Sequence, residues 1–289
     1  MKLKWKQTTG LIFALPAVVY FLLFFIFPFC YALFLGFQDY DLLSKPEFIG
    51  LANYSKMISN PSFRNSMGVT FYYTFGASIP ICIFALLFAL LFKNNFRGKY
   101  IYLTIFMMTC LMGLIPSTMA WKVLLHQDYG LFNKIFFYSW GFADKLNWLG
   151  NPNLAMPAMI IVSLSTGIPY YAIYLIGAVS GIPKEHYEVA KIEGANFFQR
   201  LRFIILPAIK NVYIFVIITA TISAFQYMGP FYVMTRGGPL DSTRVISLFI
   251  FNNAFDFQRF GYASAMTIVI LIILIPIVFG VLRRGGESD

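Results

Sequence analysis

Charged residues are scarce in this sequence, and their distribution is more informative than their number. Only 12% of the 289 residues are Asp, Glu, Lys or Arg, whereas a soluble domain contains about 25%. Six windows contain no charged residue at all: 7–38, 65–92, 100–121, 146–183, 211–235 and 260–282. Each exceeds the roughly 20 apolar residues that cross the hydrocarbon core of a bilayer. The lack of charge therefore predicts an all-α, polytopic integral membrane protein with six transmembrane helices.

Residues for catalysis, metal binding and nucleotide binding are also missing. The three cysteines, Cys30, Cys82 and Cys110, lie inside uncharged windows without disulfide or metal spacing, and the two histidines stand alone. No Gly-x-x-x-x-Gly-Lys-Ser/Thr motif is present, and no paired carboxylates lie within a window. These absences predict that the chain is not an enzyme and holds neither cofactor nor metal. Any uphill transport must take its energy from a partner.

The basic residues cluster at the edges of the expected helices. Thirteen of the 22 Lys and Arg residues fall in four short segments, 1–6, 93–99, 184–210 and 283–289, and the other nine are spread over longer loops. The positive-inside rule places such short basic segments in the cytoplasm, so both termini are expected there. Adjacency to the membrane explains the net charge of +10, and nucleic acid is not an expected partner.

We expect the whole chain, 1–289, to form a single transmembrane domain. The first apolar run, from Leu11 to about Phe37, is longer than the 7–15-residue core of a secretory signal, which predicts a retained anchor. Helical spacing of apolar residues within 38–66 predicts a short helix on the membrane surface. The six expected transmembrane helices cover residues 11–37, 68–92, 100–125, 154–180, 211–234 and 260–282.

The segment 181–210, between the fourth and fifth helices, differs from the rest of the chain. Its core, EVAKIEGANFFQRLRFIILP at 188–207, holds five charged residues in 20. Pro183 suits the start of a helix, Gly194 breaks it, and Asn196 can cap a second one. A simple solvent-exposed linker between two helices would also be charged. Such a linker needs only a few residues, however, and a longer structured one usually has a function. We therefore predict a helix–turn–helix that a partner protein can bind.

The same segment resembles the EAA loop of the membrane subunits of bacterial ABC importers. That loop has Glu-Ala-Ala, three residues, Gly, nine residues and Ile-x-Leu-Pro, and this chain departs from it only at Val189. Further similarity to the carbohydrate-uptake branch, specifically to its first, maltose- or glycerol-phosphate-type permease, lies in FIGLANY (48–54), DYGLFN (128–133), NWLGNPNLAM (147–156) and GGPLDSTRVISLFIFNNAF (237–255). One departure is LSTGIPYY at 164–171, which leaves the exact sugar open.

The resemblance implies a permease subunit of the bacterial cell inner membrane. Such a subunit pairs with a second, homologous permease and with two cytoplasmic ATPase subunits, which bind the ATP and Mg²⁺. An extracytoplasmic solute-binding protein delivers the carbohydrate, and the permeases give it alternating access. The residues that the resemblance assigns to coupling with the ATPase are Glu185, Glu188, Val189, Ala190, Glu193, Gly194 and Ala195.

A sugar path needs hydrogen-bonding groups and aromatic faces within the helices. The expected path residues are Tyr170, Gln226, Tyr227, Asn252 and Asn253. Gln226 is the strongest candidate among them, because burying an amide side chain inside a membrane helix costs free energy unless it has a hydrogen-bond partner. No Lys or Arg lies in the uncharged windows, which favours a neutral sugar over a phosphorylated polyol. The alternative is a stand-alone secondary transporter or channel for a small polar solute, which would show intramembrane ionisable groups or an inverted repeat.

Overall fold

A computed structural model describes residues 13–93, 96–140 and 146–286. Residues 1–12 and 287–289 lie outside it, and with them both chain ends whose cytoplasmic location is expected. Five helices are long and apolar enough to span a membrane, or six if a bent pair counts as one span. The chain divides into two compact units, one made of residues up to 61 and 250–273, the other of 62–249 and 274 onward.

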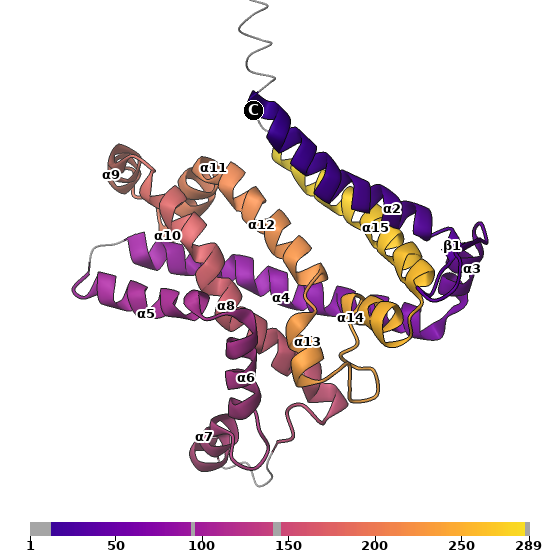
Figure 1. Cartoon of the computed structure of the whole chain (residues 1–289). Coiled ribbons are helices and arrows are strands. Elements are labelled where there is room, and N and C mark those ends of the chain that lie inside the picture. The colour runs from indigo at the N-terminus through magenta and orange to yellow at the C-terminus, as the bar shows by residue number, and fades with distance from the viewer. Residues whose placement is uncertain (1–12, 94–95, 141–145, 287–289) are drawn as a thin grey trace, which may run out of the picture. The chain divides into compact units, whose positions relative to one another are not determined.

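The first unit is built on two helices that lie along each other (Figure 1). Its elements are a continuous helix Phe13–Leu35 that includes a π-helical turn, Leu22–Ile26, and α2, Phe27–Leu35; the strands β1, Gln38–Asp39, and β2, Glu47–Phe48; α3, Ala52–Ser59; a π-helical segment, Asn252–Asp256; and the first part of α15, Phe260–Gly286. The two strands pair antiparallel, with Gln38 opposite Phe48. The helix expected on the membrane surface corresponds to α3.

Close packing in this unit depends on a glycine and an asparagine. A Cβ on Gly261, near the start of α15, would lie 1.9 Å from the backbone oxygen of Gln38. Only glycine allows α15 to begin so near β1, and its amide donates to the Tyr40 oxygen. The buried Asn53 side chain donates to the carbonyls of Gly36 and Gln38, at 3.2 and 2.9 Å. The FIGLANY stretch thus ties α3 to the end of the first helix.

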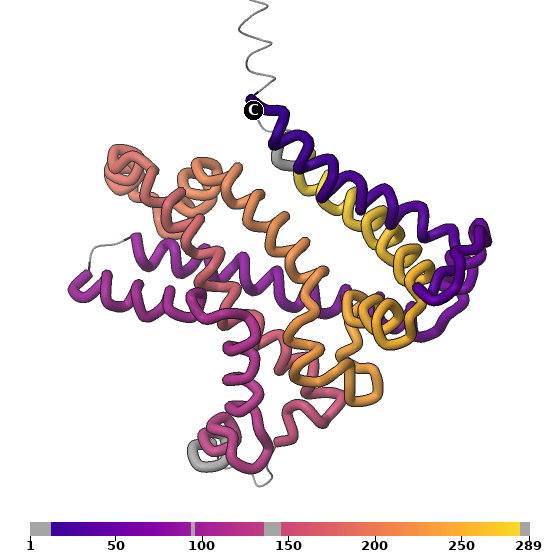
Figure 2. Tube along the Cα trace, viewed as in Figure 1, coloured from indigo at the N-terminus to yellow at the C-terminus, as the bar shows by residue number. Residues whose placement is uncertain are grey.

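The second unit contains the remaining elements (Figures 1 and 2). They are α4, Pro61–Lys93; α5, Lys99–Leu111; α6, Leu114–Leu124; α7, Leu131–Trp140; α8, Pro152–Ser180; α9, Lys184–Ile192; α10, Phe197–Arg200; a π-helical turn, Leu201–Ile205; α11, Leu206–Ala208; α12, Lys210–Phe225; α13, Gly229–Met234; α14, Ile246–Phe251, of which the last two residues belong to the first unit; and the end of α15.

Small side chains let the long helices of this unit approach closely. The buried core includes Ala77, Ala85 and Ala89 on α4, Ala172 on α8 and Ala220 on α12, each at most 2% exposed. In a bilayer, small residues at helix interfaces bring backbones into van der Waals contact, which replaces the hydrophobic driving force of water. Helix α8 packs against both α5 and α12 and so occupies the centre of the unit.

The third expected helix, 100–125, is not continuous. The structure divides it into α5 and α6, whose axes differ by 101° (Figure 2). Met112 between them is extended. In one straight helix the ring of Pro116 would clash with the carbonyl four residues earlier, that of Met112. The chain instead restarts after Gly113, with Pro116 in the first turn of α6, where its missing N–H is no loss.

The fifth expected helix, 211–234, is interrupted for the same reason. Helix α12 ends at Phe225, and α13 begins at Gly229 with Pro230 in its first turn. In a straight helix Pro230 would oppose the carbonyl of Gln226, four residues earlier. Residues 226–228 therefore leave the helix in the middle of an apolar segment. Such irregular backbone is tolerated at membrane depth only where protein buries it or where it lines a water-filled cavity.

Candidate functional site

The charged segment between α8 and α12 folds as a helix–turn–helix. Helix α9 has Glu185 in its first turn and Lys191 in its last, each of favourable sign for the helix dipole. It ends in a Schellman motif around Gly194, whose φ is +72°. There the Gly194 N–H donates to the Lys191 oxygen, and the Ala195 N–H donates to the Ala190 oxygen at 2.9 Å. The predicted break at Gly194 is confirmed.

A capping box begins the second helix directly after this turn. The N–H of Gln199 donates to the Asn196 side chain at 2.9 Å, and the N–H of Asn196 donates to the Gln199 side chain at 2.7 Å. The predicted capping role of Asn196 is thus confirmed. With a Schellman motif on one side and a capping box on the other, Gly194 lies in a defined turn rather than in a flexible linker.

The two faces of α9 differ sharply. Tyr187 and Ala190 face the protein, and Ala190 is only 4% exposed. On the opposite face Val189 and Ile192 are 54% and 86% exposed, and Phe198 on α10 is 76% exposed. Exposed groups of apolar side chains mark surfaces that interact with another protein or with a membrane. We call Val189, Ile192 and Phe198 the apolar patch.

Five of the seven residues expected to couple to an ATPase are exposed: Glu185, Glu188, Val189, Glu193 and Gly194. Ala190 is buried and Ala195 is half-buried. The small side chain of Ala190 therefore packs inside the chain, and its role in coupling stays a prediction. Sequence reasoning did not include Ile192 and Phe198. Helical spacing from Glu185 and Glu188 would have placed Ile192 on the same face.

The breaks of the third and fifth spans lie next to each other. Helix α13 packs against α6. A Cβ on Gly229, the first residue of α13, would lie 3.1 Å from the Leu114 side chain, which begins α6. Two discontinuous helices that meet within a bundle are the arrangement that transporters use to form substrate sites. The juxtaposition also explains how the irregular backbone of 226–228 is accommodated.

Tyrosine and hydroxyl side chains connect these breaks to α4 and α8. The rings of Tyr227 and Tyr73 are stacked, with centroids 5.8 Å apart. The Tyr73 hydroxyl lies close to Ser163 on α8, and the Tyr227 hydroxyl lies close to Thr166 on the same helix. Tyr227 is therefore half-buried in a packed network. Tyr73 was not predicted, although Ser66, Thr70, Thr74 and Ser78 form a polar stripe of period four beside it that could have indicated it.

Tyr170 and Gln226 are the predicted path residues that remain accessible. Tyr170 lies one turn after Thr166 on α8, is 49% exposed, and accepts a hydrogen bond from the Tyr174 hydroxyl at 3.3 Å. Gln226 caps the C-terminus of α12 and is exposed. Among the residues that the structure describes, none hydrogen-bonds to the Gln226 amide side chain. That amide is thus available to a polar solute.

The remaining predicted path residues, Asn252 and Asn253, belong to the first unit. The Asn252 side chain donates a hydrogen bond to the Asp256 carboxylate. Asn253 is 3% exposed, and its backbone oxygen accepts the N–H of Arg259 at 2.8 Å. Both therefore shape the turn that leads into α15, and their role toward a substrate stays a prediction.

The loop between α6 and α8 is organised by one buried asparagine that the sequence analysis did not single out. The Asn133 side chain donates to the oxygens of Gln127 and Leu146, both at 2.8 Å, and accepts the Trp148 indole N–H at 2.9 Å. Asn133 is 5% exposed and Trp148 8%. Both lie in the stretches DYGLFN and NWLGNPNLAM, so these motifs hold the loop together.

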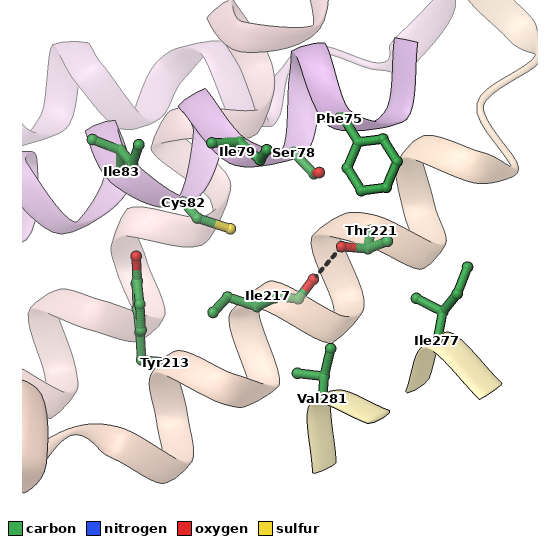
Figure 3. A pocket seen from close by; sticks show the side chains of 10 residues that line it. All are labelled: Phe75, Ser78, Ile79, Cys82, Ile83, Tyr213, Ile217, Thr221, Ile277 and Val281. Atoms are coloured by element: carbon green, nitrogen blue, oxygen red, sulfur yellow. Dashed lines mark hydrogen bonds between the residues drawn. The ribbon is translucent and has the colours of Figure 1, made fainter. Parts of the chain in front are cut away.

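A separate cavity of about 290 Å³ lies between α4, α12 and the end of α15 (Figure 3). Its walls are almost entirely apolar, and among its few polar groups Thr221 already donates to the Ile217 oxygen at 2.8 Å. None of the predicted path residues lines it. A sugar needs several hydrogen-bonding groups, so this cavity is a poor sugar site.

Comparison with known proteins gives consistent results. Residues 48–284 match the family model described as "Binding-protein-dependent transport system inner membrane component". The probable ABC transporter permease protein YesP of Bacillus subtilis (strain 168) is 35% identical over 270 residues, 92% of this chain and 86% of that protein. The trehalose/maltose transport system permease protein MalF of Thermococcus litoralis (strain ATCC 51850 / DSM 5473 / JCM 8560 / NS-C) is 30% identical over 286 residues, 98% and 96% of the two chains.

A solved structure shares the fold at lower sequence identity. It is a chain of a bacterial ABC transporter involved in the import of the acidic polysaccharide alginate, with a TM-score of 0.84 and 19% identity, and the similarity covers 100% of both chains. The chain thus shares its overall fold with a chain of that transporter.

Proposed function

The chain belongs to the family of binding-protein-dependent transport system inner membrane components, and from this premise we propose how it takes part in transport. It is a multi-pass inner-membrane permease of an ABC importer, and a solute-binding protein works with it. We propose that it forms half of a translocation path with a second, homologous permease. Two cytoplasmic ATPase subunits, which bind ATP and Mg²⁺, would drive alternating access. Both termini would be cytoplasmic.

The observation that carries this proposal is the helix–turn–helix of α9 and α10. It presents the apolar patch, with Glu185, Glu188 and Glu193 exposed nearby. The Schellman motif and the capping box on either side of Gly194 hold the helix–turn–helix in one conformation. A movement of α9 would therefore be transmitted through the turn to α10. Because the sequence has no nucleotide-binding motif of the P-loop type, a mechanical connection to a separate ATPase supplies what the chain lacks. This argues against the stand-alone transporter.

We place the substrate path where the two broken spans meet. Accessible Tyr170 and Gln226 lie there beside the half-buried Tyr227, and the unwound backbone of 226–228 offers further polar groups. Asn252 and Asn253 remain proposed members of the path. The proposed cargo is a neutral sugar. A relative of this chain carries trehalose and maltose in its name, and Lys122, a lysine inside the third span, already donates to the Val233 oxygen at 3.0 Å. A phosphorylated cargo would need a free cation.

The assembly is tested by co-purification of a tagged chain in mild detergent, with its partners identified by mass. We expect a second six-helix permease and an ATPase. Placing a charge in the apolar patch with Ile192→Asp should lose the ATPase but keep the second permease, because a buried unpaired carboxylate is costly. Leu43→Asp is the matched control, because Leu43 is 81% exposed in a loop of the first unit and should change nothing.

Recovery of the chain alone, or of a homodimer without an ATPase, would contradict the coupled importer and favour the stand-alone transporter. The cargo is tested separately, by uptake into vesicles that contain the purified complex and its binding protein. A neutral disaccharide should accumulate in an ATP-dependent manner. Uptake of glycerol phosphate without any uptake of neutral sugar would contradict the proposed cargo, while leaving the assembly intact.

A further inference from the structure

Three polar groups near the C-terminal end of α4 lack an anionic or hydrogen-bonding partner among the residues that the structure describes. The Lys93 ammonium lies over the ring of Tyr187, and the Arg200 guanidinium is close enough to repel it. The Arg200 Nε and the Tyr187 hydroxyl are both buried, and neither has a hydrogen-bond partner in the described part of the chain. Within the described residues no carboxylate forms an ion pair with Lys93 or Arg200. We call Lys93, Tyr187 and Arg200 the cationic cluster.

Two like charges that approach each other without a counter-ion are unfavourable, and buried donors without acceptors add to the cost. Burial also raises the pKa of the Tyr187 phenol, so its hydroxyl keeps a proton to donate. The cluster therefore offers an ammonium, a guanidinium and a hydroxyl to one acceptor. A phosphate group suits it, because it carries negative charge and several acceptor oxygens at once.

An apolar groove begins beside this cluster on the same helix. It has a volume of about 440 Å³ and lies between the end of α4 and the start of α5. The rings of Phe88 and Phe106 stack in it, with centroids 4.5 Å apart. Its lining includes Phe88, Leu91, Phe92, Phe96, Ile105 and Phe106. Phe92 directly precedes Lys93 in the sequence, so groove and cluster adjoin. Leu91 and Ile105 are 56% and 60% exposed, which leaves the groove open to the bilayer.

We propose that the groove and the cationic cluster together bind one anionic phospholipid. The phosphate accepts hydrogen bonds from Lys93, Arg200 and Tyr187, and one acyl chain lies in the groove. Charge complementarity selects this occupant: a free phosphate would leave the groove empty, and among phospholipids only one with net negative charge offsets the two cations of the cluster. Arg97 and Lys99, next along the chain, add attraction for an anionic headgroup.

The site has a consequence for coupling, which rests on the proposed function. Tyr187 belongs to α9 and Arg200 to α10, on opposite sides of the turn at Gly194. A phosphate held by both residues and by Lys93 would join the two helices of the coupling segment to the end of α4. The lipid would thereby stiffen the path through which a docked ATPase moves the spans.

Native mass spectrometry of the full, delipidated chain in detergent tests the site without any transport assay. The probes are dioleoylphosphatidylglycerol and dioleoylphosphatidylcholine, which share acyl chains but differ in net charge. We expect one phosphatidylglycerol to bind at a concentration about tenfold lower than phosphatidylcholine, because both lipids carry a phosphate but the choline ammonium of phosphatidylcholine offsets its charge and is repelled by Lys93 and Arg200. Lys93→Gln/Arg200→Gln should remove the preference, and it should leave folding intact because neither charge has an anionic partner among the described residues.

Two controls make the test specific. Lys191→Gln/Arg202→Gln removes the same charge from exposed positions of the same segment and should keep the preference. Ile105→Trp fills the groove from its exposed rim and should weaken both lipids. Equal binding of the two lipids, or equal loss in the two charge variants, would overturn the proposal. A third outcome would also overturn it. If inorganic phosphate displaced phosphatidylglycerol and Ile105→Trp still bound lipid normally, the cluster would be a simple phosphate site.

Discussion

Substitutions at Gly194 can separate the strain of the turn from the contact with an ATPase. Gly194 has φ of +72°, and no atom of the chain lies within 4 Å of a Cβ placed on it. An alanine there clashes with nothing, but an L-residue in this left-handed region costs about 1–2 kcal/mol. Asparagine tolerates the region better, because its side chain bonds locally. Tryptophan combines the strain with a large volume that only a docked partner would meet.

The expected ATP-dependent uptake by the reconstituted complex follows from these energies. A cost of about 1–2 kcal/mol is a factor of about 5–30 in the population of the native turn, so Gly194→Ala should reduce uptake by up to about 30-fold. Gly194→Asn should remain close to wild type, and Gly194→Trp should abolish uptake. Membrane insertion of all three, checked by the amount of monodisperse protein in detergent, should be unchanged, because the site lies outside the packed helices.

Two outcomes would refute the reasoning. Normal uptake with Gly194→Trp would mean that no partner approaches this turn. Equal loss in the alanine and asparagine variants would mean that side-chain volume, rather than backbone conformation, decides. Co-purification of the ATPase with each variant distinguishes a failure to dock from a failure to transmit the movement, because Gly194→Ala should still dock.

Three further predictions concern stability, measured as the thermal midpoint of monodisperse protein in detergent. Thr70→Val removes the hydroxyl that accepts the N–H of Ile246, the first residue of α14, at 2.7 Å. This variant should lose about 1–3 kcal/mol of stability, whereas Thr70→Ser should remain near wild type. Equal loss in both variants would show that packing, rather than this hydrogen bond, is responsible. Trp148→Phe should cost about 1 kcal/mol, because it leaves the buried Asn133 oxygen without its donor. The double variant with Asn133→Leu should lose little more stability than Asn133→Leu alone, and fully additive effects would disprove the pairing. Gly261→Ala should lose about 1–3 kcal/mol of stability, because the added Cβ would overlap the backbone of β1. Gly280→Ala is the control, because a Cβ there meets open space, and it should be neutral. An unchanged thermal midpoint for Gly261→Ala would contradict the close approach of α15 to β1.

The coupling segment shows how far local chemistry can be predicted. The break at Gly194 and the cap at Asn196 depend only on a few adjacent residues, so the sequence was sufficient for both. The burial of Ala190 and the exposure of Ile192 and Phe198 were not predictable in the same way. They depend on which face of α9 the rest of the chain covers, and that surface is built from residues distant in the sequence.

The broken spans show the same limit. Gly113, Pro116 and Pro230 were visible as helix-disrupting residues, yet a proline in a membrane helix can produce a mild kink or a complete break. Which occurs depends on whether neighbouring groups satisfy the freed backbone. Here the two breaks support each other, with Gly229 against Leu114, and no local pattern records that contact.

By itself the sequence determined the membrane character, the number of apolar spans and the place of the charged helix–turn–helix, because lipid tolerates neither charge nor unpaired backbone and so constrains every segment locally. The tertiary structure alone decided that Tyr73 stacks on Tyr227, that Asn133 holds the loop between α6 and α8, and that Lys93 lies over the ring of Tyr187. Each of these pairs joins separate helices or loop segments, and their proximity arises from packing between elements rather than from spacing along the chain.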